Sequence, residues 1–213
     1  IGVDVQYDSR SQASRPTRGL LLEAGWDRFV DLASSFLHFD RFDVAANGYL
    51  PLGGGHHLVG RLSMTHTAAR GRAAVPFYLR PTLDGILVPG WGRHRFVDSG
   101  RLIGSVLYHF PLGQPLRILR IDGHLGAHAA NVYEDLSSDF ALDLTFDEAL
   151  KAGESSIPLR PAASVGLHLG LAFRQTPSLN LALGVSPEGV TAARFTLTHS
   201  LQAFRRPHHR IRR

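Results

Sequence analysis

The sequence predicts an all-β fold, an antiparallel up-and-down transmembrane β-barrel of which about nine strands are present. Two observations support this prediction: apolar and polar residues alternate along long segments, and the very long connections fall on one rim only. Alternation with period 2 indicates a strand with two different faces. The polar faces are rich in Ser, Thr, Gly, Ala and Asn. This composition suits a barrel lumen better than the charged outer face of a soluble sandwich.

The alternation is clearest near the two ends of the chain and looser between them. In the segment 163–173, every second residue is Ala, Val, Leu or Phe, and the residues between them are mostly Ser, Gly and His. Soluble sandwiches share this pattern, but their strands are usually about five to six residues long. Barrel strands run to about ten residues or more, as these segments do. The other predicted strands are 1–8, 18–28, 35–49, 56–67, 101–111, 117–132, 178–186 and 191–204.

Connection lengths separate the two architectures. An up-and-down barrel alternates short turns at one rim with longer loops at the other, whereas a sandwich has no reason to do so. If the C-terminus is periplasmic, the long loops face the outside. One set of connections comprises 9–17, 51–55, 113–116 and 175–177; the other comprises 29–34, 69–100, 133–160 and 187–190.

Composition excludes several other classes. The chain has 213 residues, of which 44% are hydrophobic, so a disordered chain is not expected. It contains no Cys, which excludes disulfides and thiolate metal sites. No apolar run reaches the roughly 18 residues of a membrane-spanning helix. The net charge of +5 depends on the basic tail 205–213, "RRPHHRIRR", so a nucleic-acid partner is not predicted.

Five stretches of the sequence point to one family. They are the strand-turn-strand stretch "YDSRSQASRPTRGLLLEA", the loop stretches "VPFYLRPTLDG" and "VPGWGRHRFVDSG", the strand "SVLYHFPL" and the hairpin "LALGVSPEGVTAARFTLTHSLQAF". In these stretches the chain resembles the C-terminal part of the bacterial surface-antigen barrels. That superfamily of outer-membrane assembly and translocation proteins includes BamA, TamA and the two-partner-secretion transporters. The resemblance covers nearly all of residues 1–204.

The resemblance implies a larger barrel. The family fold has sixteen strands, preceded by periplasmic POTRA repeats or, in some members, by a patatin-like lipase domain. This chain matches the last nine strands, and a closed bacterial barrel needs an even number. We therefore expect residues 1–204 to be the C-terminal part of such a barrel within a longer polypeptide, followed by the tail 205–213. The aromatic residue that commonly ends the last strand corresponds to Phe204.

The resemblance also implies that the loop 69–100 folds into the lumen as a lid. The family signature is Arg-Gly-aromatic followed by Arg-Phe-x-Asp, and its Arg pairs with an Asp on a later strand. Here Pro89 stands in place of the Arg and His128 in place of the Asp, so we expect a more weakly held lid. The matching loop residues are Pro89, Gly90, Trp91, Arg95, Phe96 and Asp98.

No catalytic, cofactor or metal site is predicted. Asp122, His124 and His128 share one strand face, but at about 3.3 Å per residue the two histidines are roughly 13 Å apart, too far to bind one ion. Asp122 and His124, about 7 Å apart, could do so only with a ligand from another strand. The sequence favours polar lining of the lumen. His56 and His57 are interpreted as solvated turn residues. The acidic loop 133–160 is predicted to be solvated, with divalent ions that bridge lipopolysaccharide as the alternative.

The predicted function is non-enzymatic insertion of outer-membrane proteins, or translocation of polypeptide, in the outer membrane of a Gram-negative bacterium. The first and last strands would part, and the strand 191–204 would pair with an incoming strand. The predicted partners are outer-membrane lipid and lipopolysaccharide, client polypeptides, and POTRA domains on an N-terminal part. The alternatives are a barrel that anchors a patatin-like lipase, and a plain porin-like or structural barrel.

Overall fold

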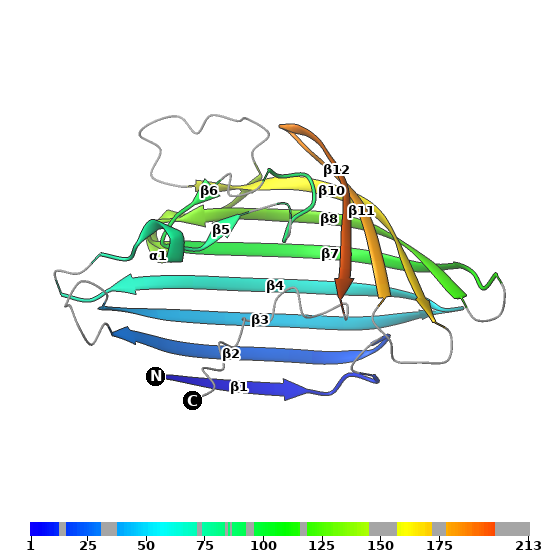
Figure 1. The fold of residues 1–213 in the computed structure, drawn as a ribbon, viewed down its shortest axis with the longest axis horizontal. Coiled ribbons are helices and arrows are strands. Elements are labelled where there is room, and N and C mark those ends of the chain that lie inside the picture. The colour runs from blue at the N-terminus through cyan, green and yellow to red at the C-terminus, as the bar shows by residue number, and fades with distance from the viewer. Residues whose placement is uncertain are drawn as a thin grey trace.

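A computed structural model shows nine strands that follow one another in a single antiparallel sheet (Figure 1). It describes residues 1–12, 16–30, 38–71, 74–83, 85, 87–92, 96–115, 119–144, 157–171 and 178–198. This order confirms the predicted all-β, up-and-down arrangement. The strands are β1 (Gly2–Asp8), β2 (Gly19–Val30), β3 (His38–Gly53), β4 (His56–Ala69), β7 (Gly100–Gly113), β8 (Leu119–Tyr133), β10 (Ile157–Leu171), β11 (Ser178–Ser186) and β12 (Gly189–Thr198).

Smaller elements lie in the two long connections. Between β4 and β7, the 3-10 helix η1 (Phe77–Leu79) precedes β5 (Thr82–Leu83), which pairs with β6 (Phe96–Val97). Between β8 and β10, the helix α1 (Leu136–Asp139) leads into β9 (Phe140–Leu144), which pairs in parallel with the start of β10. Neither helix in the described ranges is long and apolar enough to cross a membrane.

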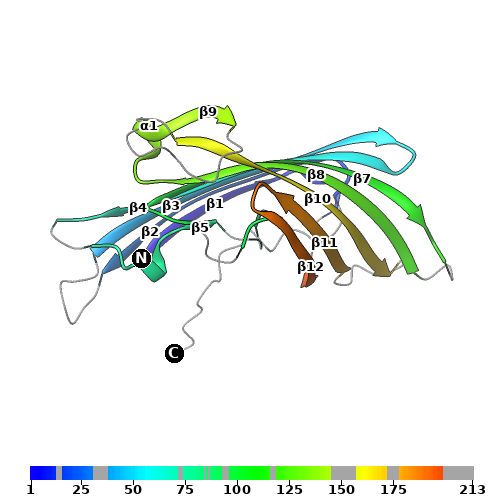
Figure 2. The ribbon, with the colours of Figure 1, turned by 90° about the horizontal axis from the view of Figure 1, so that it is seen from above.

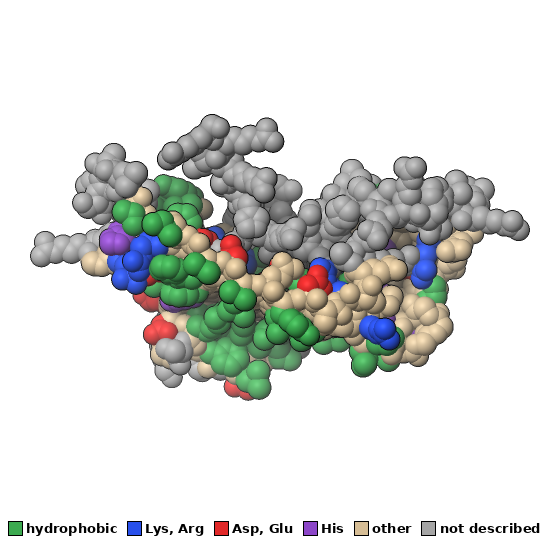
Figure 3. All heavy atoms as spheres, turned by 90° about the horizontal axis from the view of Figure 1, so that it is seen from below, with side chains coloured by type: hydrophobic (Ala, Val, Ile, Leu, Met, Phe, Trp, Pro, Cys, Tyr) green, Lys and Arg blue, Asp and Glu red, His purple; other side chains and the backbone are tan. Residues whose placement is uncertain are grey.

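Burial on the two faces of the sheet is the reverse of burial in a soluble protein. Large apolar side chains on one face are exposed, while small polar side chains on the other face are buried. Figure 3 shows hydrophobic side chains gathered over the convex face. An apolar outer face and a polar inner face are the arrangement of a transmembrane barrel. Examples are the exposed Val44, Leu62, Val106, Leu125 and Val165, and the buried Asn47, Ser63, Ser105, His128 and Ser164.

The sheet is curved but not closed (Figure 2). Within the described ranges, β1 pairs only with β2 and β12 pairs only with β11. Both strands therefore lie at sheet edges. The strands between them are long enough to span a membrane, since a tilted barrel strand needs only about 9–11 residues and β3 has 16.

Candidate functional site: the loop on the concave face

The connection between β4 and β7 packs against the concave face of the sheet (Figure 2). Apolar loop residues contact inward-facing residues of β7, β8 and β10. Each residue of this cluster is less than a tenth exposed. Apolar burial therefore holds the loop on an otherwise polar face. The loop contributes Leu83, Val88 and Trp91, and the sheet contributes Ile103, Ala130, Val132 and Ala162.

Trp91 is the largest loop side chain in this cluster and is only 2% exposed. Its ring meets Phe96 edge to face, with ring centroids 5.6 Å apart. On the other side, the guanidinium carbon of Arg160 on β10 lies 4.4 Å from the centroid of Phe96, which is a cation–π contact. Phe96 thus joins Trp91 to the sheet. The loop signature includes Trp91 and Phe96 but not Arg160.

Gly90 and Gly184 allow the loop backbone to touch β11. Gly90 has φ +114°, a conformation that L side chains rarely adopt, and a Cβ at Gly184 would lie 2.1 Å from the Gly90 nitrogen. Ser186 donates a 2.7 Å hydrogen bond from its hydroxyl to the Gly90 carbonyl. The sequence singled out Gly90, but it treated Gly184 and Ser186 only as part of an alternating strand. Only the packing reveals their role.

Arg101, at the start of β7, fastens the loop to the sheet. It donates hydrogen bonds to the Thr82 carbonyl (2.9 Å) and to Oγ1 of Thr65 on β4 (3.1 Å). The Thr65 hydroxyl donates in turn to the Asp43 carboxylate on β3, at 2.7 Å. A chain of polar contacts therefore runs from the loop across three strands. Sequence reasoning missed this anchor, because its members are far apart in the chain.

Asp98 shapes the end of the loop. Its backbone N–H donates to the Pro81 carbonyl (3.2 Å), and its carboxylate accepts the N–H of Ser99 (2.7 Å). Thr67 on β4 donates from its backbone and from its hydroxyl to the Ser99 carbonyl, at 2.7 and 2.9 Å. Of the residues in the loop signature, Gly90, Trp91 and Phe96 lie where the loop meets the sheet, and Asp98 makes its bonds within the loop. Arg95 lies outside the described residues.

His128 lies on β8 between two serines. Its Nδ1 is 2.8 Å from the Ser105 hydroxyl on β7, and its Nε2 is 2.9 Å from the Ser164 hydroxyl on β10. Ser164 is also the cross-strand partner of Gly184, against which Pro89 packs. Ser164 thus contacts His128, and its cross-strand partner Gly184 contacts Pro89.

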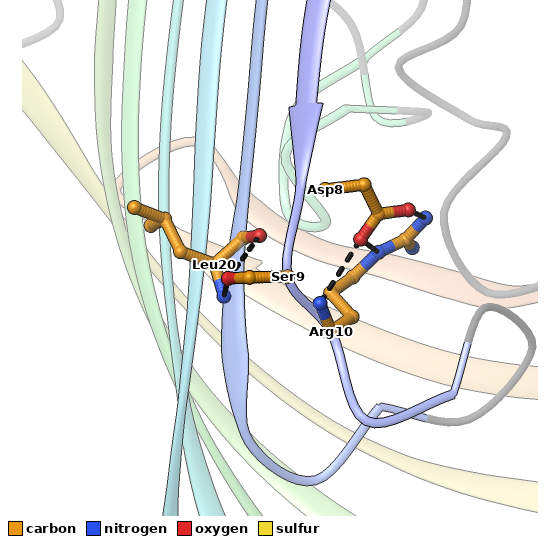
Figure 4. Close-up of polar contacts among 4 residues, drawn as sticks. All are labelled: Asp8, Ser9, Arg10 and Leu20. Carbon is orange, nitrogen blue, oxygen red and sulfur yellow. Dashed lines mark hydrogen bonds and ion pairs between the residues drawn. The ribbon is translucent and has the colours of Figure 1, made fainter.

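The Tyr-Asp-x-Arg stretch, residues 7–10, spans the end of β1 and the start of the turn to β2 (Figure 4). Arg10 contacts both carboxylate oxygens of Asp8, at 2.8 and 2.6 Å. Hydrogen bonding to Asp8 raises the pKa of the Arg10 guanidinium. Ser9 donates its N–H to the Leu20 carbonyl, and its hydroxyl accepts the Leu20 N–H. The motif is therefore a structural clamp on the hairpin.

The interpretation of His56 and His57 as turn residues is wrong, and both side chains are half-buried. The turn is confined to Gly54 and Gly55, and β4 begins at His56. The His57 ring stacks on His109 of β7 with centroids 4.8 Å apart, and His56 Nδ1 lies 2.7 Å from the Tyr108 hydroxyl. The alternation in 56–67 could have shown this, because it places His57 in phase with the inward-facing Ser63.

Two other predicted regions are only partly described. In the acidic loop 133–160, the structure describes α1, β9 and the first residues of β10, and positions 145–156 lie outside the description. Phe204 and the tail 205–213 also lie outside the described residues, because the description ends at Thr198 in β12.

An antiparallel sheet with an apolar convex face, a polar concave face and a loop packed inside defines part of an outer-membrane β-barrel. Comparison with protein families agrees: the Omp85 superfamily domain matches residues 1–177. The chain belongs to the Omp85 superfamily, which confirms the resemblance to the surface-antigen barrels. Membership supports a general role in outer-membrane assembly or translocation. A search of curated proteins finds no match.

Proposed function

We propose that this chain forms the C-terminal part of an outer-membrane barrel that inserts other outer-membrane proteins, with β12 as the strand that pairs with the client. The observation that carries this proposal is the position of β12. Within the described residues, it is hydrogen-bonded to β11 on one side only, at the edge of a sheet with an apolar outer face. An exposed edge of this kind can accept an incoming strand by β-augmentation.

The edge pairing itself favours opening. The β11–β12 register is irregular between Ala182 and Gly184, and a bulge locally disrupts the ladder of hydrogen bonds. A strand with an interrupted ladder separates from its neighbour more readily than a regular one.

The docked loop favours insertion over passage through a wide pore. Its apolar cluster covers one end of the concave side of β7, β8 and β10, across the path that a polypeptide translocated through the lumen would take. A route along the lateral edge leaves this packing intact. The free edge of β1 requires further strands in lipid, because unpaired backbone groups there cost several kcal/mol each. We propose that the preceding strands of a sixteen-stranded barrel supply them, with POTRA domains on the periplasmic side.

Site-specific photocrosslinking in the full-length protein tests the proposal. A photoreactive residue at Thr196 of β12 should crosslink newly made outer-membrane proteins in cells. The control is Leu62 of β4, an exposed residue on a strand that is paired on both sides. Equal crosslinking at both positions, or none at Thr196, would reject β12 as the client-pairing strand. Esterase activity of the full-length protein would favour the lipase-anchor alternative instead.

A further inference from the structure

Histidines from four adjacent strands gather on the concave face, well away from the loop. His57 of β4, His109 of β7, His124 of β8 and His168 of β10 have ring centroids 4.8 to 5.5 Å from at least one other member. His109 is six residues along β7 from Ile103, the loop-contacting residue, which is about 20 Å at 3.3 Å per residue. The cluster is therefore separate from the docked loop.

We propose that His109, His124 and His168 form a binding site for a divalent transition-metal ion of the Zn²⁺, Co²⁺ or Ni²⁺ type. Imidazole nitrogen is a preferred ligand of these ions. Sequence reasoning set a metal site aside because His124 and His128 are too far apart along one strand. In the sheet, neighbouring strands place His109 and His168 beside His124.

The three ring centroids form a triangle of the size that a tetrahedrally coordinated ion requires. Their centroid separations are 5.5 Å (His109–His124), 5.2 Å (His109–His168) and 5.0 Å (His124–His168). With a metal–nitrogen distance of about 2.0–2.1 Å, an imidazole centroid lies about 3.2 Å from the ion. Tetrahedral geometry then places neighbouring centroids about 5.2 Å apart. Three histidines leave the fourth position open to water.

Strand register brings these side chains to one place. His109 and His124 are direct cross-strand partners between β7 and β8. His168 is paired with Asp122, two residues before His124 and on the same face of β8. Directly opposed side chains have Cβ atoms about 4.5–5.5 Å apart, and diagonal ones remain within reach of a ring. The backbone pairing therefore brings the three histidines close together, and their rotamers complete the triangle.

His124 has the burial and the open bonding position of a ligand. The residue is 3% exposed, and its Nδ1 has no hydrogen-bond partner among the described residues. A buried polar atom without a partner costs about 1–3 kcal/mol, which coordination would offset. Gly166 on β10 makes room for the ring, because a Cβ there would lie 2.2 Å from His124 Cε1.

Binding requires the rings to turn. Among the described residues, no three side chains of His, Cys, Asp or Glu already converge on a common ion position. The ring planes of the triangle are inclined at 30° to 51° to one another. Rotation about χ2 swings the nitrogens but hardly moves the centroid, and this torsion is broad for histidine. The separations between the ring centroids should therefore change little when the ion binds.

Neighbouring groups set the strength of the site. His57 stacks on His109 with planes 6° apart, which restrains the orientation of that ring. Asp122 accepts a 3.0 Å bond from Arg120. Arg61 of β4 is close enough to interact electrostatically with His109 and His124, and its positive charge opposes cation binding. We therefore expect a weaker site than one surrounded by carboxylates.

Cobalt titration of the full-length protein in detergent tests this proposal. His208 and His209 of the tail are replaced by Gln in every variant, so that the tail cannot bind the metal. The protein with an intact triangle should bind one Co²⁺ per chain and develop the visible absorption of four-coordinate cobalt. His109→Gln, His124→Gln and His168→Gln should each weaken binding at least about tenfold, since changes around metal ligands cost 10–100-fold in affinity.

His128→Gln is the matched control. His128 is also buried on the concave face of β8, but its nitrogens face Ser105 and Ser164. Its replacement should leave Co²⁺ affinity and spectrum unchanged. Only variants that migrate in a gel as heat-resistant barrels, and are therefore folded, are compared. Absence of saturable binding to the intact triangle, or equal affinity in folded variants lacking two of its histidines, would overturn the proposal.

Discussion

The two ends of the concave face differ although the same three strands form both. Where the loop docks, β7, β8 and β10 present the apolar Ile103, Ala130 and Ala162. About 20 Å along the same strands they present histidines instead. Ile103 and Ala130 are buried, and so are His109 and His124, so burial alone does not set residue type. The apolar loop packs on the first region, whereas the histidines of the second pack against one another.

Removal of the Trp91 side chain should have the largest effect on the packing of the loop against the concave face. Trp91→Ala deletes the largest loop side chain of the apolar cluster, and a buried Trp→Ala change costs about 3–5 kcal/mol. We expect the loop to leave the face and become sensitive to protease, while the strands keep their heat-resistant migration. Phe77→Ala is the control, because Phe77 is 76% exposed. Equal protease resistance in both variants would show that Trp91 does not hold the loop.

An ion pair introduced at positions 89 and 128 should have the next largest effect on the loop. Pro89→Arg or His128→Asp alone leaves a charge without its partner. Together they restore the ion pair of the family signature, whose charge-assisted bond contributes about 1.5–3 kcal/mol. We expect each single change to loosen the loop and the double change to tighten it. Protease accessibility or pore conductance measures this coupling. Additive effects would mean that positions 89 and 128 do not face each other.

A side chain at Gly184 should loosen the loop to a smaller extent. Gly184→Ala places a Cβ 2.1 Å from the Gly90 nitrogen, so the loop and β11 must separate slightly. Overpacking of this kind costs about 1–3 kcal/mol. Gly60→Ala is the control, since nothing lies within 4 Å of a Cβ there. Resistance of the loop to protease should fall for Gly184→Ala only; an equal fall in both variants would show that the contact between Gly184 and Gly90 does not hold the loop.

Truncation after Phe204 should have the smallest effect. The predicted strand pattern ends at Phe204, and the tail 205–213 contains five Arg and one Pro without alternation. We expect the truncated full-length protein to retain heat-resistant migration and the protease resistance of the loop. Loss of either property would make the tail a structural part of the barrel.

The sequence by itself determined the elements and their faces. Period-2 alternation is local, so it predicted the strands and the polar face without knowledge of any contact, and the connection lengths predicted the up-and-down order. Local motifs such as "VPGWGRHRFVDSG" likewise identified the family and the loop residues Gly90, Trp91 and Phe96.

Only the tertiary structure decided which distant residues meet. Register pairs His109 with His124 and brings His168 beside them, and docking places Gly90 against Gly184. Alternation is the same for any even shift of a strand, so it assigns a side chain to a face but not to a neighbour. Arg101 was missed for the same reason, because its partners Thr82 and Thr65 lie on separate elements. Contacts across strands arise from pairing between distant segments, which no local pattern records.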